Sequence, residues 1–63
     1  MSAAEESLAR VEQLLERLEA ARARLEATDD PEAAIETLTE LQEIARDVEA
    51  ELTRARRAAD AGA

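Results

Sequence analysis

The stretch LEATDDPEAAIE, residues 25–36, contains the single proline of a chain that otherwise favours helix. Pro31 lacks an N–H and its φ suits the first turn of a helix, while Asp30 before it is a favoured N-cap residue. Pro31 also disfavours helical backbone at Asp30, so one continuous helix cannot pass through this point. The stretch therefore predicts the end of one helix and the start of another.

The two flanking segments carry start and stop signals of their own. Ser2 and Glu5 fit the S-x-x-E capping box, which predicts a first helix over about residues 3–28. Gly62 is a plausible stop for a second helix over about residues 31–60. Because a turn as short as residues 28–30 forces the helices to run antiparallel, the sequence predicts an all-α antiparallel helical hairpin, one domain of residues 1–63.

Large apolar residues recur at spacings of three and four, the pattern of packed helices. In the first helix they form two overlapping rows, wider than the two positions per heptad of a simple coiled-coil dimer. In the second helix we expect the row to be Ala34, Leu38, Leu41, Ala45, Val48, Leu52, Ala55 and Ala59. The predicted core and interface residues are Leu8, Val11, Leu14, Leu15, Leu18, Leu25, Ile35, Leu38, Leu41, Ile44, Val48 and Leu52.

The hairpin register can be predicted from the same rows. We expect Leu18 to face Leu41 and Ala21 to face Leu38, so that the numbers of each pair add to 59. This register leaves Leu15, Ile35 and Ile44 facing water, a patch that a monomer seldom carries. A second copy would cover it, so the sequence predicts a homodimer that forms a four-helix bundle with two-fold symmetry.

The chain's size and composition support self-association. A single core in 63 residues supplies roughly 3–5 kcal/mol of stability, and most chains of this length need further support. Cys and His are both absent, which excludes disulfides and argues against a zinc site. Aromatic residues are absent too, and the dominance of Ala, Glu, Leu and Arg is typical of long helices and coiled coils.

The charge distribution restricts the partners. The chain carries a net charge of −8, and residues 29–51 alone hold nine acids against Arg46. Such an acidic segment repels phosphates, which argues against nucleic-acid binding. No apolar run is long enough to cross a membrane, and the first ten residues lack a signal-peptide pattern, so we expect a cytoplasmic protein. The basic cluster Arg54, Arg56 and Arg57 either compensates the helix dipole or contacts a partner.

The remaining charged residues have both structural and functional interpretations. Asp29, Asp30 and Glu32 could bind a hard cation, but their spacing differs from known calcium loops and suits helix capping. Pairs such as Asp47 with Glu51 place like charges one turn apart, and without His we interpret them as solvated. Arg22 either fixes register, contacts a partner or extends its head into solvent. No nucleophile–base arrangement or phosphate loop is present, so we expect neither catalysis nor a bound cofactor or metal.

Two families resemble parts of this chain. The length, the hairpin pattern and LEATDDPEAA resemble the plasmid repressor of primer family, which implies a dimeric four-helix bundle. That family binds RNA through basic and aromatic side chains of its first helix, and here the chain has neither Lys nor aromatic residues. The segment EAAIETLTELQEIARDVEAELTRA, residues 32–55, is similar to the small subunit of exonuclease VII. The matching residues are Leu25-Glu26 before the segment and, within it, residues 32–35, 44–46 and 52–55. That similarity implies a non-catalytic helical subunit, although the family's Gly-x-Leu-x-Leu turn is replaced here by TDDP.

Two functional hypotheses follow from the sequence. The first is a non-catalytic helical module that associates with itself. The alternative is an accessory subunit of a larger enzyme, such as the exonuclease VII small subunit. Sequence alone identifies no protein partner.

Overall fold

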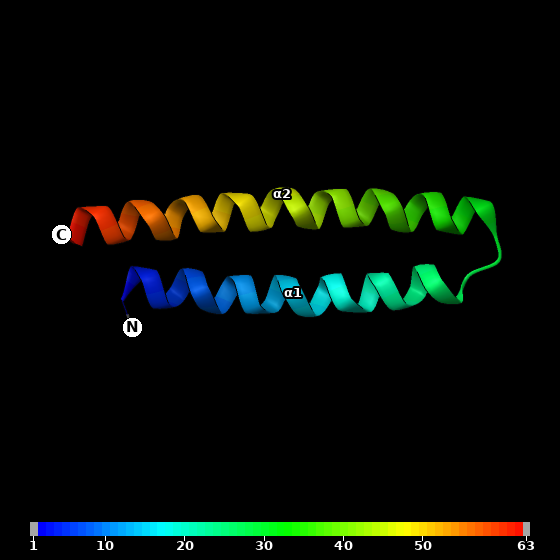
Figure 1. The fold of residues 1–63 in the computed structure, drawn as a ribbon, viewed down its shortest axis with the longest axis horizontal. Coiled ribbons are helices and arrows are strands. Elements are labelled where there is room, and N and C mark those ends of the chain that lie inside the picture. Colours follow the sequence, from blue (N-terminus) through cyan, green and yellow to red (C-terminus); the bar gives the residue numbers. More distant parts are fainter. Residues whose placement is uncertain (1, 63) are drawn as a thin grey trace.

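The computed structural model describes residues 2–62, and it contains two helices joined by a short turn (Figure 1). Helix α1 spans Ala3–Ala27 and helix α2 spans Pro31–Gly62. The helices lie side by side and antiparallel, which confirms the predicted all-α hairpin. Helix α1 ends one residue earlier than expected and α2 continues two residues further. Met1 and Ala63, the end residues of the predicted domain, lie outside the described residues.

Helix α1 begins as its sequence predicts. Ser2 has extended backbone, with φ −75° and ψ 163°, and its Oγ accepts a hydrogen bond from the Glu5 N–H at 3.1 Å. Glu5 and Glu6 add negative charge to the first turn, where it favours the helix dipole. At the other end Thr28 is extended again, with φ −93° and ψ 139°, which ends the helix before the acidic turn.

The turn between the helices is held by short-range hydrogen bonds. Asp30 Oδ1 accepts the N–H of Glu32 at 3.2 Å, and the Asp30 carbonyl accepts the N–H of Ala34 at 2.9 Å. Asp30 is therefore the N-cap of α2, and Pro31 is its first residue, as predicted. The Asp30 N–H in turn donates to Thr28 Oγ1 at 3.3 Å. The carboxylate of Asp30 thus organises the turn itself.

We expect Asp30→Ala to reduce stability by about 0.5–2 kcal/mol, the usual cost of removing an N-cap. The variant leaves the Glu32 N–H without its side-chain acceptor. Urea unfolding followed by circular dichroism measures the loss. The matched control is Asp29→Ala, which removes a neighbouring exposed carboxylate that is not the cap. Equal stability of the two variants would contradict the capping role.

Each helix packs on the other through positions spaced alternately by three and four residues. In α1 the buried or half-buried positions at this spacing are Ser7, Val11, Leu14, Leu18, Ala21 and Leu25. In α2 the buried or half-buried positions at this spacing are Ala34, Thr37, Leu41, Ile44, Val48, Glu51, Ala55 and Ala58. We call these two rows the interface positions. Thr37 fits there because its hydroxyl donates to the Ala33 carbonyl at 2.9 Å, which satisfies a polar group in a half-buried place.

Helix α2 is rotated relative to the orientation that the sequence predicted. Ile44, expected to face water, is fully buried, whereas Leu38 and Leu52, expected to face α1, are 48% and 52% exposed. The predicted register is wrong as well. Residues joined across the hairpin, Arg24 with Glu40 and Arg10 with Glu51, have numbers that add to 64 and 61 rather than 59. The physical reason is that α2 carries two adjacent apolar rows, and a single neighbouring helix can cover one of them.

The hairpin encloses a small core. Among residues 2–62 the buried apolar side chains are those of Val11, Ala21 and Ile44, and Ile44 is the largest of the fully buried ones. The molecule is long and flat, with Cα extents of 49 × 16 × 11 Å. Two helices side by side have no third layer, so much of each apolar stripe stays open. In residues 2–62 neither helix contains a stretch apolar enough to cross a membrane.

Candidate interaction surface

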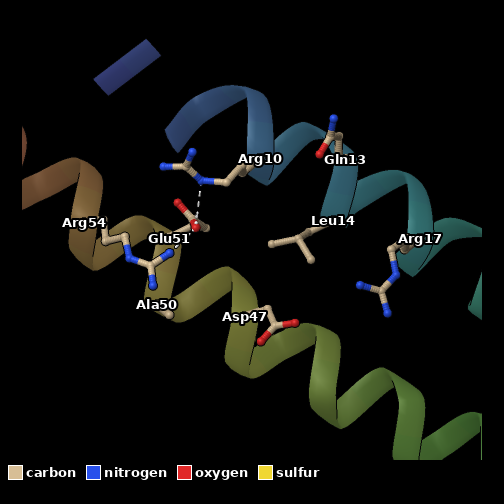
Figure 2. A pocket seen from close by; sticks show the side chains of 8 residues that line it. All are labelled: Arg10, Gln13, Leu14, Arg17, Asp47, Ala50, Glu51 and Arg54. Carbon is tan, nitrogen blue, oxygen red and sulfur yellow. Dashed lines mark hydrogen bonds and ion pairs between the residues drawn. The ribbon is translucent and has the colours of Figure 1, made fainter. Parts of the chain in front are cut away.

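One long edge of the hairpin is charged. Its members each precede an interface position by one residue, and we call them the charged edge: Arg10, Arg17 and Arg24 of α1, and Glu40, Asp47 and Arg54 of α2. Arg24 forms an ion pair with Glu40 across the hairpin. Further along, a pocket of about 300 Å³ opens between the helices. It is lined by Arg10, Gln13, Leu14, Arg17, Asp47, Ala50, Glu51 and Arg54 (Figure 2).

A carboxylate lies buried beside this edge. Glu51 occupies an interface position and is 5% exposed. Arg10 Nε of α1 contacts Glu51 Oε1 at 2.9 Å, and the guanidinium of Arg54 donates to the same oxygen (Figure 2). Arg10 also donates to the buried Ser7 hydroxyl at 3.4 Å. These four side chains form a polar layer near the open end of the hairpin.

The polar layer fixes the ionisation of Glu51. The hydrogen bond from Arg10 holds the pKa of the Glu51 carboxyl below its usual value of 4.5, and the nearby charges of Arg10 and Arg54 act in the same direction. Burial opposes this shift because it disfavours the charged form. Within residues 2–62, Glu51 Oε2 is buried without a hydrogen-bond partner. Glu51 therefore stays ionised at neutral pH, which suits a fixed charge that aligns the two helices and not a proton donor.

The sequence interpretation of Glu51 was wrong. Its spacing from Asp47 suggested a solvated pair of like charges, yet Asp47 is exposed and Glu51 is buried. Glu51 lies seven residues after Ile44 and so shares its side of α2, which the sequence expected to face water. The rotation of α2 that buries Ile44 also buries Glu51. Of the basic cluster, Arg54 lines the same pocket as Arg10, while Arg56 and Arg57 are exposed.

We expect Glu51→Gln to melt at a lower temperature than the wild type at pH 7, and the difference to vanish in acid. The folded-state pKa of Glu51 is lowered, so its contribution is fully present above the unfolded pKa of about 4.5 and disappears as pH falls through the folded pKa. Thermal melts of both proteins from pH 7 to pH 2 measure the difference. General repulsion among carboxylates weakens in both proteins alike and cancels. The control is Glu43→Gln, at an exposed position of the same helix. Its melting temperature should stay close to that of the wild type at every pH.

Within residues 2–62, five large apolar side chains are exposed, with exposed fractions between 48% and 63%: Leu8, Leu15, Ile35, Leu38 and Leu52. We call them the apolar face. Leu8 and Leu15 each follow an interface position of α1, and Leu38 and Leu52 each follow one of α2. Ile35 lies three residues before Leu38 and so shares its side of the helix.

The apolar face lies on one side of the molecule. Successive helical residues are about 100° apart, so positions just before and just after an interface position lie on opposite sides of the interface. The preceding positions of both helices share one side, as the Arg24–Glu40 ion pair and the common pocket show. The following positions of both helices must therefore share the other side. The charged edge therefore lies on one flat side of the hairpin and the apolar face on the other.

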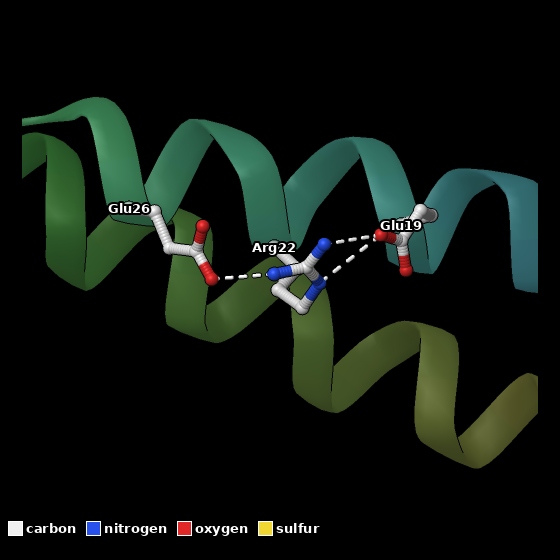
Figure 3. Close-up of polar contacts among 3 residues, drawn as sticks. All are labelled: Glu19, Arg22 and Glu26. Carbon is white, nitrogen blue, oxygen red and sulfur yellow. Dashed lines mark hydrogen bonds and ion pairs between the residues drawn. The ribbon is translucent and has the colours of Figure 1, made fainter.

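Arg22 interrupts the apolar face on α1. It lies seven residues after Leu15 and is 52% exposed. Its guanidinium lies between Glu19 and Glu26 of the same helix, with Nε donating to Glu19 Oε1 at 3.2 Å (Figure 3). The hydrogen bond from Arg22 lowers the pKa of the Glu19 carboxyl. The long side chain thus holds a charged cluster on the solvent side, in agreement with the interpretation that its head extends outward.

The other predicted interface residues lie inside the hairpin. Val11 and Ile44 are buried, and Leu14, Leu18, Leu25, Leu41 and Val48 are half-buried. The exposed members of the predicted set are those of the apolar face. The structure therefore divides the set into a contact within the hairpin and an open surface.

The acidic residues do not assemble a metal site in the part of the chain that the structure describes. Residues 2–62 contain no group of three or more carboxylates placed to hold a metal ion. At the turn, the Asp30 carboxylate is engaged by backbone N–H of Glu32, a capping contact. No protein-family model, curated protein or solved structure matches this chain.

Proposed function

We propose that this protein is a non-catalytic self-association module, in which two hairpins pack through their apolar faces into a four-helix bundle. The observation that carries the proposal is the gathering of five large apolar residues on one side of a hairpin whose own core is small. Large apolar side chains exposed together on one side of a small protein mark interaction sites. A small helical chain without cysteine gains most from burying this surface against another helix pair.

The dimensions of the hairpin support this proposal. Its flat side measures 49 Å by 16 Å between Cα extremes, or roughly 800 Å² in projection. Stable interfaces bury about 800 Å² on each partner. A second hairpin has the same length and flatness, and its apolar face offers the matching surface. The charged edge, on the opposite side, stays in water, where its arginines and carboxylates are hydrated.

Sedimentation equilibrium of the purified chain tests the proposal. We expect the measured mass to approach twice 6.9 kDa as concentration rises. The experiment needs about 0.15 M salt, because two copies of charge −8 repel each other and salt screens that repulsion. A mass of 6.9 kDa over the whole concentration range would overturn the proposal. It would favour the alternative of an accessory subunit whose apolar face meets a different protein.

A further inference from the structure

The apolar face is unequally divided between the helices. On α2 it comprises Ile35, Leu38 and Leu52, with the exposed Ala45 midway between the two leucines. From Ile35 to Leu52 this stripe extends over roughly 25 Å of helix, at 1.5 Å per residue. On α1 it comprises Leu8 and Leu15, both in the half of the helix far from the turn. Helix α2 therefore offers the longer and more continuous contact.

The charged cluster of Arg22 determines what Ile35 and Leu38 of a second copy would face. Near the turn, α1 presents Glu19, Arg22 and Glu26 where an apolar stripe would continue (Figure 3). If α2 of a second copy lay against α1 with the turns at the same end, its Ile35 and Leu38 would cover this cluster. These two apolar side chains would then face charged side chains and gain no apolar neighbour. If α2 instead lies against α2 in the opposite direction, Leu38 of one copy meets Leu52 of the other.

The charge distribution favours the same arrangement. The half of the hairpin next to the turn, residues 16–44, holds nine acids and three arginines, a net charge of −6. The open half, residues 1–15 and 45–63, holds seven acids and five arginines, a net charge of −2. If the turns of the two copies lay at the same end, the half with net charge −6 would lie beside the same half of the other copy. If the turns lie at opposite ends, each half with net charge −6 lies beside a half with net charge −2, which lowers the repulsion between the copies.

We propose that the second copy docks with its α2 antiparallel to α2 of the first, about a two-fold axis that crosses the helices near Ala45. This inference rests on the proposed function and specifies which helix forms the contact and in which direction. Ala45 of each copy then lies closest to Ala45 of the other, and the small side chain lets the two helices approach. The turns lie at opposite ends of the bundle.

Cysteine cross-linking tests the arrangement, because the chain has no cysteine of its own. We expect Ala45→Cys to form a disulfide-linked dimer under mild oxidation. A mixture of Leu38→Cys and Leu52→Cys should cross-link at least about tenfold faster than Leu38→Cys mixed with Arg22→Cys, because proximity raises the effective thiol concentration. Gln13→Cys, on the side of the charged edge, is the control and should remain monomeric on a denaturing gel.

The outcomes separate the two proposals. Faster cross-linking of Leu38→Cys with Arg22→Cys would overturn the packing of α2 against α2. It would leave the proposed self-association unaffected. A wild-type chain that sediments as a monomer would overturn the proposed function, and the arrangement with it. Circular dichroism of each variant confirms that the helices form before cross-linking is compared. Ala45→Cys is the mildest change and provides the result if a leucine variant does not fold.

Discussion

Ile44→Ala is expected to unfold a large part of the population at room temperature. Ile44 is fully buried, and replacing a buried isoleucine by alanine costs about 2–5 kcal/mol through lost burial and an unfilled cavity. A core in a chain of this size supplies roughly 3–5 kcal/mol in total. The loss therefore approaches the whole stability of the hairpin. Circular dichroism at 222 nm during thermal and urea unfolding measures it, at one fixed protein concentration because association adds to apparent stability.

Glu43→Ala is the matched control for the core substitution. It removes the exposed side chain of the preceding residue, so backbone propensity and position along α2 are nearly the same. Surface changes of this kind usually stay within about 0.5 kcal/mol. Equal melting temperatures for Ile44→Ala and Glu43→Ala would mean that Ile44 faces water. The orientation of α2 predicted from sequence, with Leu38 and Leu52 toward α1, would then be the correct one.

The double substitution Leu15→Glu with Leu52→Glu is expected to keep the chain monomeric. Both side chains are about half exposed in the hairpin, so a carboxylate at either position can stay hydrated while the chain is alone. In the proposed bundle four new carboxylates would lie in the contact between the copies, and each carries a penalty of several kcal/mol unless it is paired or protonated. We expect the dissociation constant to rise by about 100-fold or more, equivalent to roughly 2.7 kcal/mol. Sedimentation equilibrium beside the wild type measures the change.

Gln13→Glu is the control for the association surface. It places a new carboxylate on α1 beside the pocket of the charged edge, on the side opposite the apolar face. We expect its dissociation constant to change severalfold at most, through general repulsion that salt screens. If the double variant dimerised as tightly as the Gln13→Glu variant, the apolar face would not be the contact. Circular dichroism at 222 nm of both variants distinguishes lost association from lost folding.

The turn shows why the hairpin itself could be predicted from sequence. Asp30 and Pro31 act through backbone geometry and hydrogen bonds within four residues, as the Asp30 contacts with Glu32 and Ala34 show. Ser2 acts in the same local way at the start of α1. Such signals depend on neighbouring residues in the chain and need no knowledge of distant contacts. The helix bounds and their antiparallel direction follow from them.

The orientation of α2 could not be predicted in the same way. Its apolar residues form two rows separated by one position, represented by Ile44 in one and Leu38 with Leu52 in the other. Local propensity is the same whichever row faces α1, so the choice depends on how the whole helix packs. The expected row contained more large apolar residues, and the observed row places Glu51 where Arg10 of the other helix can reach it. The Arg10–Glu51 contact joins residues 41 positions apart, beyond the range of any periodicity argument.

The sequence by itself determined two helices, their ends, their antiparallel direction and an excess of apolar surface, because each depends on short-range spacing and on composition. Only the tertiary structure decided which apolar row is used inside the hairpin and which remains open. It buried Glu51 between two arginines and placed Leu8, Leu15, Ile35, Leu38 and Leu52 on one side, opposite the charged edge. The physical reason is that a helix rotates about its own axis at little local cost. Its facing side is settled by contacts summed along its full length.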